Sequence, residues 1–265
     1  MTLESSAVLP PAPGAVSTRR LLVVQALYEV RVLLRNGEQA LLTVVIPLLA
    51  LVGLTRTSVV TLEGTTTQAD RISTVVPGII ALALLSSAFT AQAISVAFDR
   101  RYGVLLHAGT TPLGRFGLIA GKTLAVTALA VAQVAVVSAV ALALGWRPTG
   151  GLTGALAIFI LALLAVTAFS GLALLMAGTL RAEATLAAAN LVFLLLLIGG
   201  GTVLASTQVP EAARVVVNLL PTAALGTGLR AVLRDGTQVP LHCWLVLVTW
   251  ATVAVGAALR WFRWD

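Results

Sequence analysis

Six long stretches of this chain are almost free of charged residues. They cover about residues 39–60, 74–98, 115–144, 152–179, 184–205 and 240–260. A helix needs roughly 20 apolar residues to cross the hydrocarbon core of a bilayer, and each stretch is long enough. The stretches are apolar on all sides and show no alternation of period two, so helices fit better than barrel strands. The sequence predicts an all-α polytopic membrane protein with six transmembrane helices.

The composition and charge of the chain indicate which kinds of surroundings and partner molecules to expect. The 265 residues are 58% hydrophobic and 10% charged, whereas soluble domains carry about 25% charged residues. The net charge of +7 does not indicate nucleic acid, because the arginines flank the spans instead of gathering on one polar domain. They are expected to meet lipid headgroups and to fix orientation. Cys243 is the only cysteine, which excludes an internal disulfide and a CxxC motif.

The arginines also predict which side each loop lies on. Lys and Arg next to spans concentrate in the cytoplasm. With the N-terminus inside, eleven basic residues are cytoplasmic and six are external. The cytoplasmic set is Arg19, Arg20, Arg31, Arg35, Arg100, Arg101, Arg115, Lys122, Arg181, Arg260 and Arg263. Both termini are therefore predicted to be cytoplasmic, although three external arginines between residues 206 and 239 run against the rule.

A different kind of segment precedes the first span. Residues 1–18 hold three prolines and are expected to be a disordered tail, and residues 19–265 are expected to form a single transmembrane domain. Residues 19–36 place leucines and valines on one half of a helical wheel and charged residues on the other. This pattern predicts an amphipathic helix in the cytoplasmic headgroup region. The alternatives are a simple membrane anchor, and a twin-arginine signal at Arg19-Arg20, which Glu29 and Arg31 disfavour.

Two short helices are predicted between spans five and six, over residues 210–236. Pro210 with Glu211 is suited to start the first helix and Pro221 the second, and Asp235-Gly236 ends it. Each helix is too short to cross a bilayer, so the pair is expected to form a re-entrant or surface-lying hairpin on the outer side. A single crossing by residues 210–234 is the alternative, and its arginines argue against it.

The span interiors carry no Asp, Glu or Lys away from their ends, which argues against a proton- or sodium-driven carrier. Gln92, Gln133 and Asn190 are the strongest candidates to meet a polar part of a substrate, although amides in spans usually bond across helices. Lys122, the only lysine, is expected to extend its side chain to headgroup phosphates. Gly121-Lys122-Thr123 lacks the first glycine of a P-loop. No metal-binding or catalytic motif is present, so no catalytic residue and no metal ligand is predicted.

Two segments carry a family resemblance. One is Glu29-Val-Arg31-Val-Leu-Leu-Arg35-Asn36, followed by Pro47-Leu-Leu in the first span. The other is Arg100-Arg101-Tyr-Gly103-Val-Leu-Leu, followed by Thr111-Pro112-Leu-Gly-Arg115 and Gly121-Lys122. With six spans and the amphipathic helix, these segments resemble the permease of a bacterial ATP-binding-cassette (ABC) exporter of the type-2 class, which includes drug, lipid and polysaccharide exporters. Asp99 stands where such a segment would have Glu.

The resemblance implies that transport and ATP hydrolysis are carried out by separate subunits. The permease would sit in the bacterial cell membrane, pair with a second copy or a sister permease, and contact a separate ABC nucleotide-binding subunit. This chain would need no cofactor, and ATP and Mg²⁺ would bind the partner ATPase. The loop 99–115 would be the coupling helix, assisted by residues Glu29 to Arg35, and the outer hairpin would form part of an exit gate.

The resemblance also implies which residues take part in coupling and gating. The coupling residues are Glu29, Arg31, Arg35, Asp99, Arg100, Arg101, Gly103, Thr111, Pro112 and Arg115. The outer-gate residues are Pro210, Pro221 and Arg230. The apolar interior favours a hydrophobic or lipid-like substrate. An ion-coupled carrier or channel, and an intramembrane lipid-modifying enzyme, are the alternative functions.

Overall fold

The computed structural model describes residues 17–35, 37–56, 67–105, 114–200 and 211–263. The described parts are helical and contain no strand. In chain order the elements are α1 (Thr18–Arg35), α2 (Gly37–Arg56), α3 (Gln68–Leu85), the π-helix η1 (Ser86–Ala91), α4 (Gln92–Arg101), α6 (Gly114–Ala143), α7 (Gly151–Thr179), α8 (Ala182–Gly199), α9 (Glu211–Asn218), α10 (Pro221–Leu233) and α11 (Leu241–Trp261).

Five of the described helices are long and apolar enough to cross a membrane. The first is a continuous helix of 34 residues, Gln68–Arg101, which joins α3, η1 and α4. The others lie in α6, α7, α8 and α11. The apolar part described for α2, Thr43–Arg56, is shorter than these. The all-helical membrane class is confirmed, whereas six spans and an interfacial position for α1 stay predictions.

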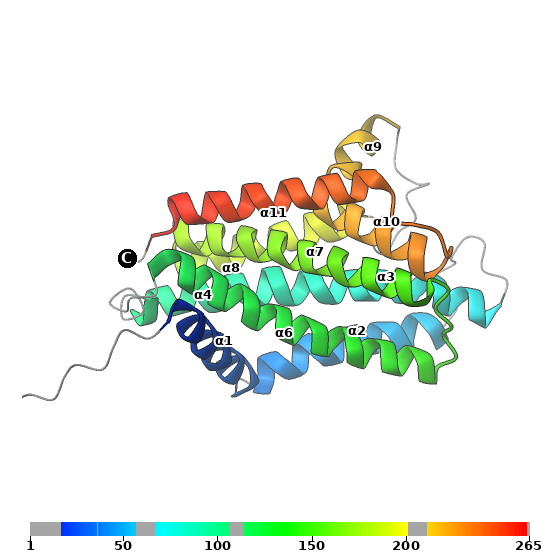
Figure 1. Ribbon diagram of the computed structural model, residues 1–265, viewed down its shortest axis with the longest axis horizontal. Coiled ribbons are helices and arrows are strands. Elements are labelled where there is room, and N and C mark those ends of the chain that lie inside the picture. The colour runs from blue at the N-terminus through cyan, green and yellow to red at the C-terminus, as the bar shows by residue number, and fades with distance from the viewer. Residues whose placement is uncertain (1–16, 36, 57–66, 106–113, 201–210, 264–265) are drawn as a thin grey trace, which may run out of the picture.

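The long helices run side by side, and α1 lies obliquely at one end of the bundle (Figure 1). The described chain begins with α1 and ends after α11 at this same end, which we call the α1 end. The helices α9 and α10 belong to the other half of the molecule, which we call the α10 end. This arrangement agrees with an even number of passes between α1 and the end of α11.

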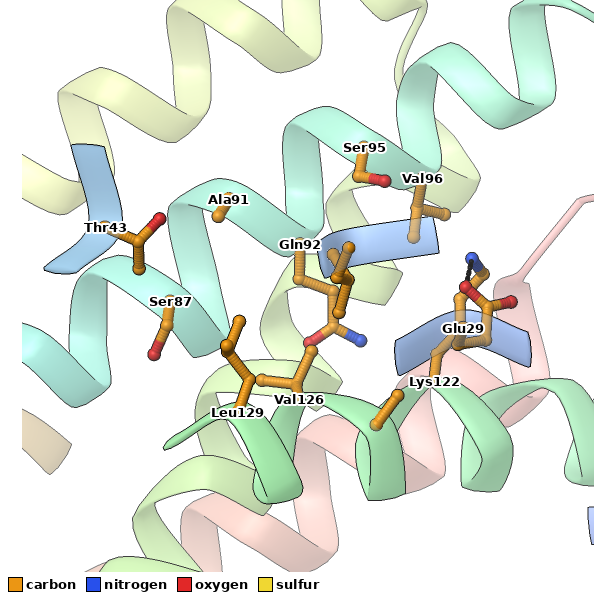
Figure 2. Close-up of a pocket in the computed structure, with 12 residues that line it drawn as sticks. Glu29, Thr43, Ser87, Ala91, Gln92, Ser95, Val96, Lys122, Val126 and Leu129 are labelled. Carbon is orange, nitrogen blue, oxygen red and sulfur yellow. Dashed lines mark hydrogen bonds and ion pairs between the residues drawn. The ribbon is translucent and has the colours of Figure 1, made fainter. Parts of the chain in front are cut away.

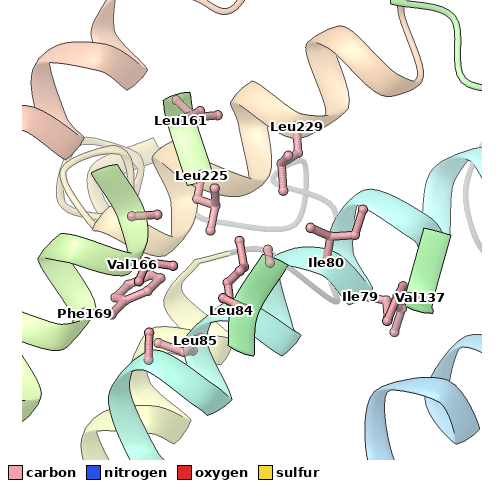
Figure 3. Close-up of a cluster of buried hydrophobic side chains, with 14 of the residues drawn as sticks. Ile79, Ile80, Leu84, Leu85, Val137, Leu161, Val166, Phe169, Leu225 and Leu229 are labelled. Carbon is pink, nitrogen blue, oxygen red and sulfur yellow. The ribbon is translucent and has the colours of Figure 1, made fainter. Parts of the chain in front are cut away.

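The α3–η1–α4 helix is the most deeply buried of the five, and it forms the centre of the core. Leu84 and Leu85 pack with Phe169 of α7 and Leu225 of α10 (Figure 3). Among helices in lipid, such contacts stabilise through close packing, because lipid tails are as apolar as leucine. The core therefore joins α3, α7 and α10 into one unit.

The predicted hairpin consists of two helices with different surroundings. Nearly every residue of α10 is buried, and the helix packs on α3, α7, α8 and α11. In α9, by contrast, Val215 and Val216 are exposed, as is Leu219 directly after the helix. The helix α10 is thus inserted into the bundle, while α9 projects from it (Figure 1). After α10, Gly236 adopts a φ of +65°, which agrees with the stop predicted at Asp235-Gly236.

The start of α3 lies six residues before the predicted start of the second span. Thr67 accepts a hydrogen bond from the backbone N–H of Asp70, and the Asp70 carboxylate accepts one from the backbone N–H of Thr67. This reciprocal capping box satisfies backbone donors that a new helix leaves unpaired. The helix can therefore begin among polar residues, ahead of its apolar segment.

Candidate coupling site at the α1 end

A buried ion-pair network joins three helices at the α1 end. The Lys122 ammonium of α6 lies 2.9 Å from a Glu29 carboxylate oxygen of α1 and 2.9 Å from an Asp99 carboxylate oxygen of α4. The side chain of Lys122 is 5% exposed, and those of Glu29 and Asp99 are 12% and 27% exposed. We call these three residues the Lys122 network (Figure 2 shows the pair with Glu29). It connects segments 93 and 23 residues apart in the chain.

The Lys122 network corrects an expectation about Lys122. Its ammonium does not extend to the surface toward headgroup phosphates, because two carboxylates bind it inside the protein. An ammonium buried without partners would be strongly unfavourable, whereas these partners supply both charge and acceptors. The same pairs occupy Glu29 and Asp99, two of the predicted coupling residues, so in this conformation their carboxylates face α6.

Arg100 bonds to the C-terminal end of α7, and Arg101 pairs with the N-terminal end of α8. Arg100 Nη1 donates to the Ala177 carbonyl at 3.3 Å and to the Leu180 carbonyl at 3.1 Å, so it satisfies acceptors at the end of α7. Arg101 forms an exposed ion pair with Glu183 in the first turn of α8. Such exposed pairs contribute at most about 1 kcal/mol, so Arg101 stays able to exchange partners.

Several predicted coupling residues do lie on the surface. Arg31 and Arg35 of α1 are exposed, and Arg101 is followed by exposed Tyr102 and Val104. Gly103 has a φ of +73°, a conformation in which glycine is favoured. Thr111 and Pro112 lie outside the described residues, and so does the side chain of Arg115. The described surface of the site is therefore one face of α1 and the turn after α4.

A small polar pocket lies next to the Lys122 network, between α1, α2, α4, η1 and α6 (Figure 2). Its volume is about 30 Å³, and its polar lining is Glu29, Thr43, Ser87, Gln92, Ser95 and Lys122. A cavity needs about 10–15 Å³ to hold a water molecule, so this pocket admits one or two. Sites for small organic molecules are roughly ten times larger. In this conformation the pocket is a water-sized site and not a substrate cavity.

Gln92 is the polar side chain that this pocket leaves without a protein partner. The residue is 4% exposed, and neither its amide nitrogen nor its amide oxygen has a hydrogen-bond partner among the described residues. The π-helix η1 ends directly before it. Single π-turns inside α-helices widen the backbone and often mark functional positions. Water in the pocket would supply the partners that a buried amide requires.

Replacing Gln92 with Met is expected to lower the thermal midpoint, because the water that bonds the amide would lose a partner, at a cost of about 1 kcal/mol. The measurement is the unfolding midpoint of the purified chain in lipid nanodiscs. Leu129→Met is the control, since Leu129 lines the same pocket and this swap conserves volume. A rise in the midpoint of Gln92→Met would mean that the pocket is dry.

The three predicted substrate-path residues have different surroundings. Gln92 lines the pocket, as does Thr43. Gln133 is buried and donates to the Thr43 carbonyl of α2, so it bonds across helices as amides in spans usually do. Asn190 lies on the exposed face of α8. Among the outer-gate residues, Pro221 is the buried first residue of α10 and Arg230 lies on the same helix, while Pro210 lies outside the described residues.

Glu183 and the pocket-lining Ser95 are not among the residues singled out from the sequence. A usable signal existed for Glu183, because it is one of only ten acidic residues and stands at the start of a span, where a negative charge favours the helix dipole. Ser95 carries no pattern that separates it from other hydroxyls in spans. Within the described parts of the chain, no group of three or more His, Cys, Asp or Glu residues is placed to hold a metal ion.

The family model described as ABC-2 type transporter matches residues 22–233. This range covers most of the chain, from α1 to the end of α10. The chain belongs to the ABC-2 type transporter family. No curated protein resembles the chain closely enough to count as a match. As an ABC-2 permease it is a multi-pass membrane protein and a transport subunit, and members of this family typically pair with an ABC ATPase subunit.

The structure brings together, at the α1 end, the charged segments on which the family resemblance rests. The segment around Glu29 and the segment from Asp99 to Arg101 are distant in sequence, and Lys122 unites them at one end of the bundle. The resemblance seen in the sequence rests on these same segments. The α1 end of this ABC-2 permease is therefore built from the two segments on which that resemblance rests.

Proposed function

We propose that this ABC-2 permease is the membrane subunit of a bacterial exporter and that a separate ABC ATPase binds its α1 end. The ATPase would hydrolyse ATP with Mg²⁺, and the permease would move a hydrophobic or lipid-like substrate outward. In this proposal the α1 end and both termini face the cytoplasm. The chain provides six passes, with α2 as the first and α1 lying along the inner headgroups.

The observation that carries the proposal is the exposed turn after α4. Arg101 and Tyr102 project from the end of the most buried helix of the bundle. A partner that pushes on this turn therefore acts on the centre of the core. Arg31 and Arg35 on α1 add positive charge to the same end. Basic side chains on a protein surface favour a partner with complementary acidic groups.

A second permease is proposed to cover the exposed face of α8. Asn190 lies on that face, and its neighbours Leu191, Leu194 and Leu195 are exposed. An amide in contact with lipid tails lacks hydrogen-bond partners, which costs free energy. A partner helix, or a polar group of a substrate passing between two permeases, would remove this cost. The proposal therefore keeps Asn190 as a substrate-path residue, and it accommodates either an identical or a sister partner.

The α10 end is proposed to form the outer gate. Residues on α10 pack against α3, α7, α8 and α11, and Thr222 donates from the start of α10 to the Leu196 carbonyl of α8. A change in the position of α8 would therefore be transmitted to α10. Pro221 and Arg230 keep their proposed gate roles on this basis, together with Pro210 before α9.

The alternatives have less support. An ion-coupled carrier places ionisable groups near the middle of its spans, and the charged side chain that is buried in a described span, Lys122, is already paired twice. Lipid-modifying chemistry needs a polar catalytic pair in one cavity, and the polar pocket at the Lys122 network has room for water alone. The substrate is proposed to be a drug, lipid or glycolipid because the exposed faces of the spans are apolar.

Expression of the permease with the cassette ATPase encoded nearest to it tests the proposed function. The two proteins are expected to co-purify, and transport of a lipid-like substrate into vesicles is expected to require ATP. The control is an ATPase whose catalytic carboxylate is removed, which should bind and not support transport. Transport by the permease alone under an ion gradient would favour the carrier instead.

A further inference from the structure

The Lys122 network lies where three helices reach the proposed ATPase-binding end. Lys122 is on α6, Glu29 on α1 and Asp99 on α4, and the turn with Arg101 and Tyr102 begins two residues after Asp99. A lysine ammonium carries three donors, and two of them bond carboxylates here. One side chain thus links the amphipathic helix, the coupling turn and the base of a span.

The helices α1 and α6 also come close together beside the Lys122 network. A Cβ built on Gly121 would lie 2.6 Å from Gln25 Cγ and 3.3 Å from Gln25 Cβ, so α1 approaches α6 at a position where a side chain would not fit. Gln25 Nε2 in turn donates to Glu29 Oε1 at 2.8 Å. The close approach of α1 at Gly121 and the Lys122–Glu29 ion pair therefore fix the same position of α1 along α6.

A buried ion pair adds little to the free energy of folding, but it restricts the relative position of the two helices that carry its charges. Replacing a buried ion pair with apolar residues often leaves stability unchanged or higher, whereas a charged pair is satisfied at few positions. An apolar contact at this place would hold α1 near α6 and permit it to slide. The Lys122–Glu29 pair, whose side chains are 5% and 12% exposed, therefore favours one position of α1 on α6.

We propose that Lys122 is a positioning residue that makes the inner ends of α1, α4 and α6 one rigid body. A force on the turn after α4 then displaces α1 and α6 together with α4. That an ATPase supplies this force rests on the proposed function, whereas the rigid body does not depend on it. The polar pocket beside the Lys122 network supplies water-sized space next to the buried charges.

The first test is a covalent lock between α1 and α6. Cysteines at Gln25→Cys and Gly121→Cys, in a Cys243→Ala background, would place two Cβ atoms close to the separation that a disulfide needs. If α1 and α6 move as one body, the oxidised protein transports at the same rate as the reduced protein, within about twofold. Inhibition on oxidation that a reductant reverses would overturn the proposal, because it would mean that the helices separate in each cycle.

The second test removes the charges. Lys122→Met alone leaves two carboxylates unpaired and is expected to fold poorly, so the informative variant is Lys122→Met with Glu29→Gln and Asp99→Asn. This neutral variant is expected to fold and to co-purify with the ATPase, and substrate is expected to stimulate its ATP hydrolysis at least tenfold less than in the wild type. The disulfide lock between residues 25 and 121, added to the neutral variant, replaces the link between α1 and α6 and should restore part of the stimulation. Wild-type stimulation without the lock would overturn the proposal.

A third measurement needs no ATPase. Spin labels at Leu27→Cys of α1 and Leu124→Cys of α6, both exposed, report the distance between the helices in nanodiscs. The wild type is expected to give one narrow distribution and the neutral variant a broad one. Equal widths would contradict the rigid body. If no ATPase binds the wild type while the widths differ as expected, the proposed function fails and the rigid body stands.

Discussion

Replacing Arg101 with Glu together with Tyr102 with Ala is expected to reduce substrate-stimulated ATP hydrolysis at least tenfold while the fold stays intact. Both side chains are exposed, so the change acts on the surface offered to the ATPase. Reversing one charge and removing one aromatic ring takes away the contact types that dominate protein interfaces. ATP hydrolysis with and without substrate, in reconstituted vesicles, measures the effect.

The matched control reverses charges at the other end of the bundle. Arg147→Glu with Arg234→Glu changes two exposed arginines near the α10 end and is expected to leave the stimulation unchanged. Arg100 is kept in both variants, because it holds the end of α7 through the Ala177 and Leu180 carbonyls. Equal losses in the two variants would place the ATPase contact elsewhere.

The largest effect on stability is expected from Gly171→Val. A Cβ on Gly171 of α7 would lie 2.8 Å from the Val255 backbone nitrogen and 2.9 Å from the Ala254 carbonyl carbon of α11. Backbone atoms cannot turn aside as a flexible side chain can, so α7 and α11 would have to separate. Overpacking of this kind costs about 3 kcal/mol, which corresponds to a fall of roughly 6–12 °C in the unfolding midpoint. Heating the purified chain and measuring its monodisperse fraction tests this.

Gly256→Val is the control for this prediction, since a Cβ on Gly256 of α11 meets nothing within 4 Å. Valine there is expected to leave the midpoint unchanged or to raise it, because glycine weakens a helix interior. A similar fall in both variants would mean that the loss comes from the helices themselves and not from the contact between α7 and α11.

Much of this fold could be predicted from the sequence because lipid imposes one strong condition. Backbone groups in the hydrocarbon must bond within their own segment, so long apolar stretches become helices. The helices α6, α7 and α11 begin and end within a residue of the predicted spans 115–144, 152–179 and 240–260. Local rules also worked at Pro221 and Gly236, where the start and the stop of α10 depend on backbone conformation alone.

The candidate site was less predictable, since it depends on which helices meet. Lys122 was expected at the headgroups because its own neighbours in sequence place it near a span end. Its burial depends on Glu29, 93 residues away, and no local pattern encodes that distance. The π-helix η1 has the same origin, because nothing in Ser86–Ala91 distinguishes it from an ordinary turn until its packing is known.

The surroundings of α10 also determine when this helix can take its place during synthesis. Two of the helices that enclose it, α3 and α7, precede it in the chain, and a third, α11, follows it. When the ribosome has produced α10, one wall of its site does not yet exist. The enclosure of α10 is therefore complete only after the last span has been made. A chain cut off before α11 is expected to leave uncovered the side of α10 that α11 packs against.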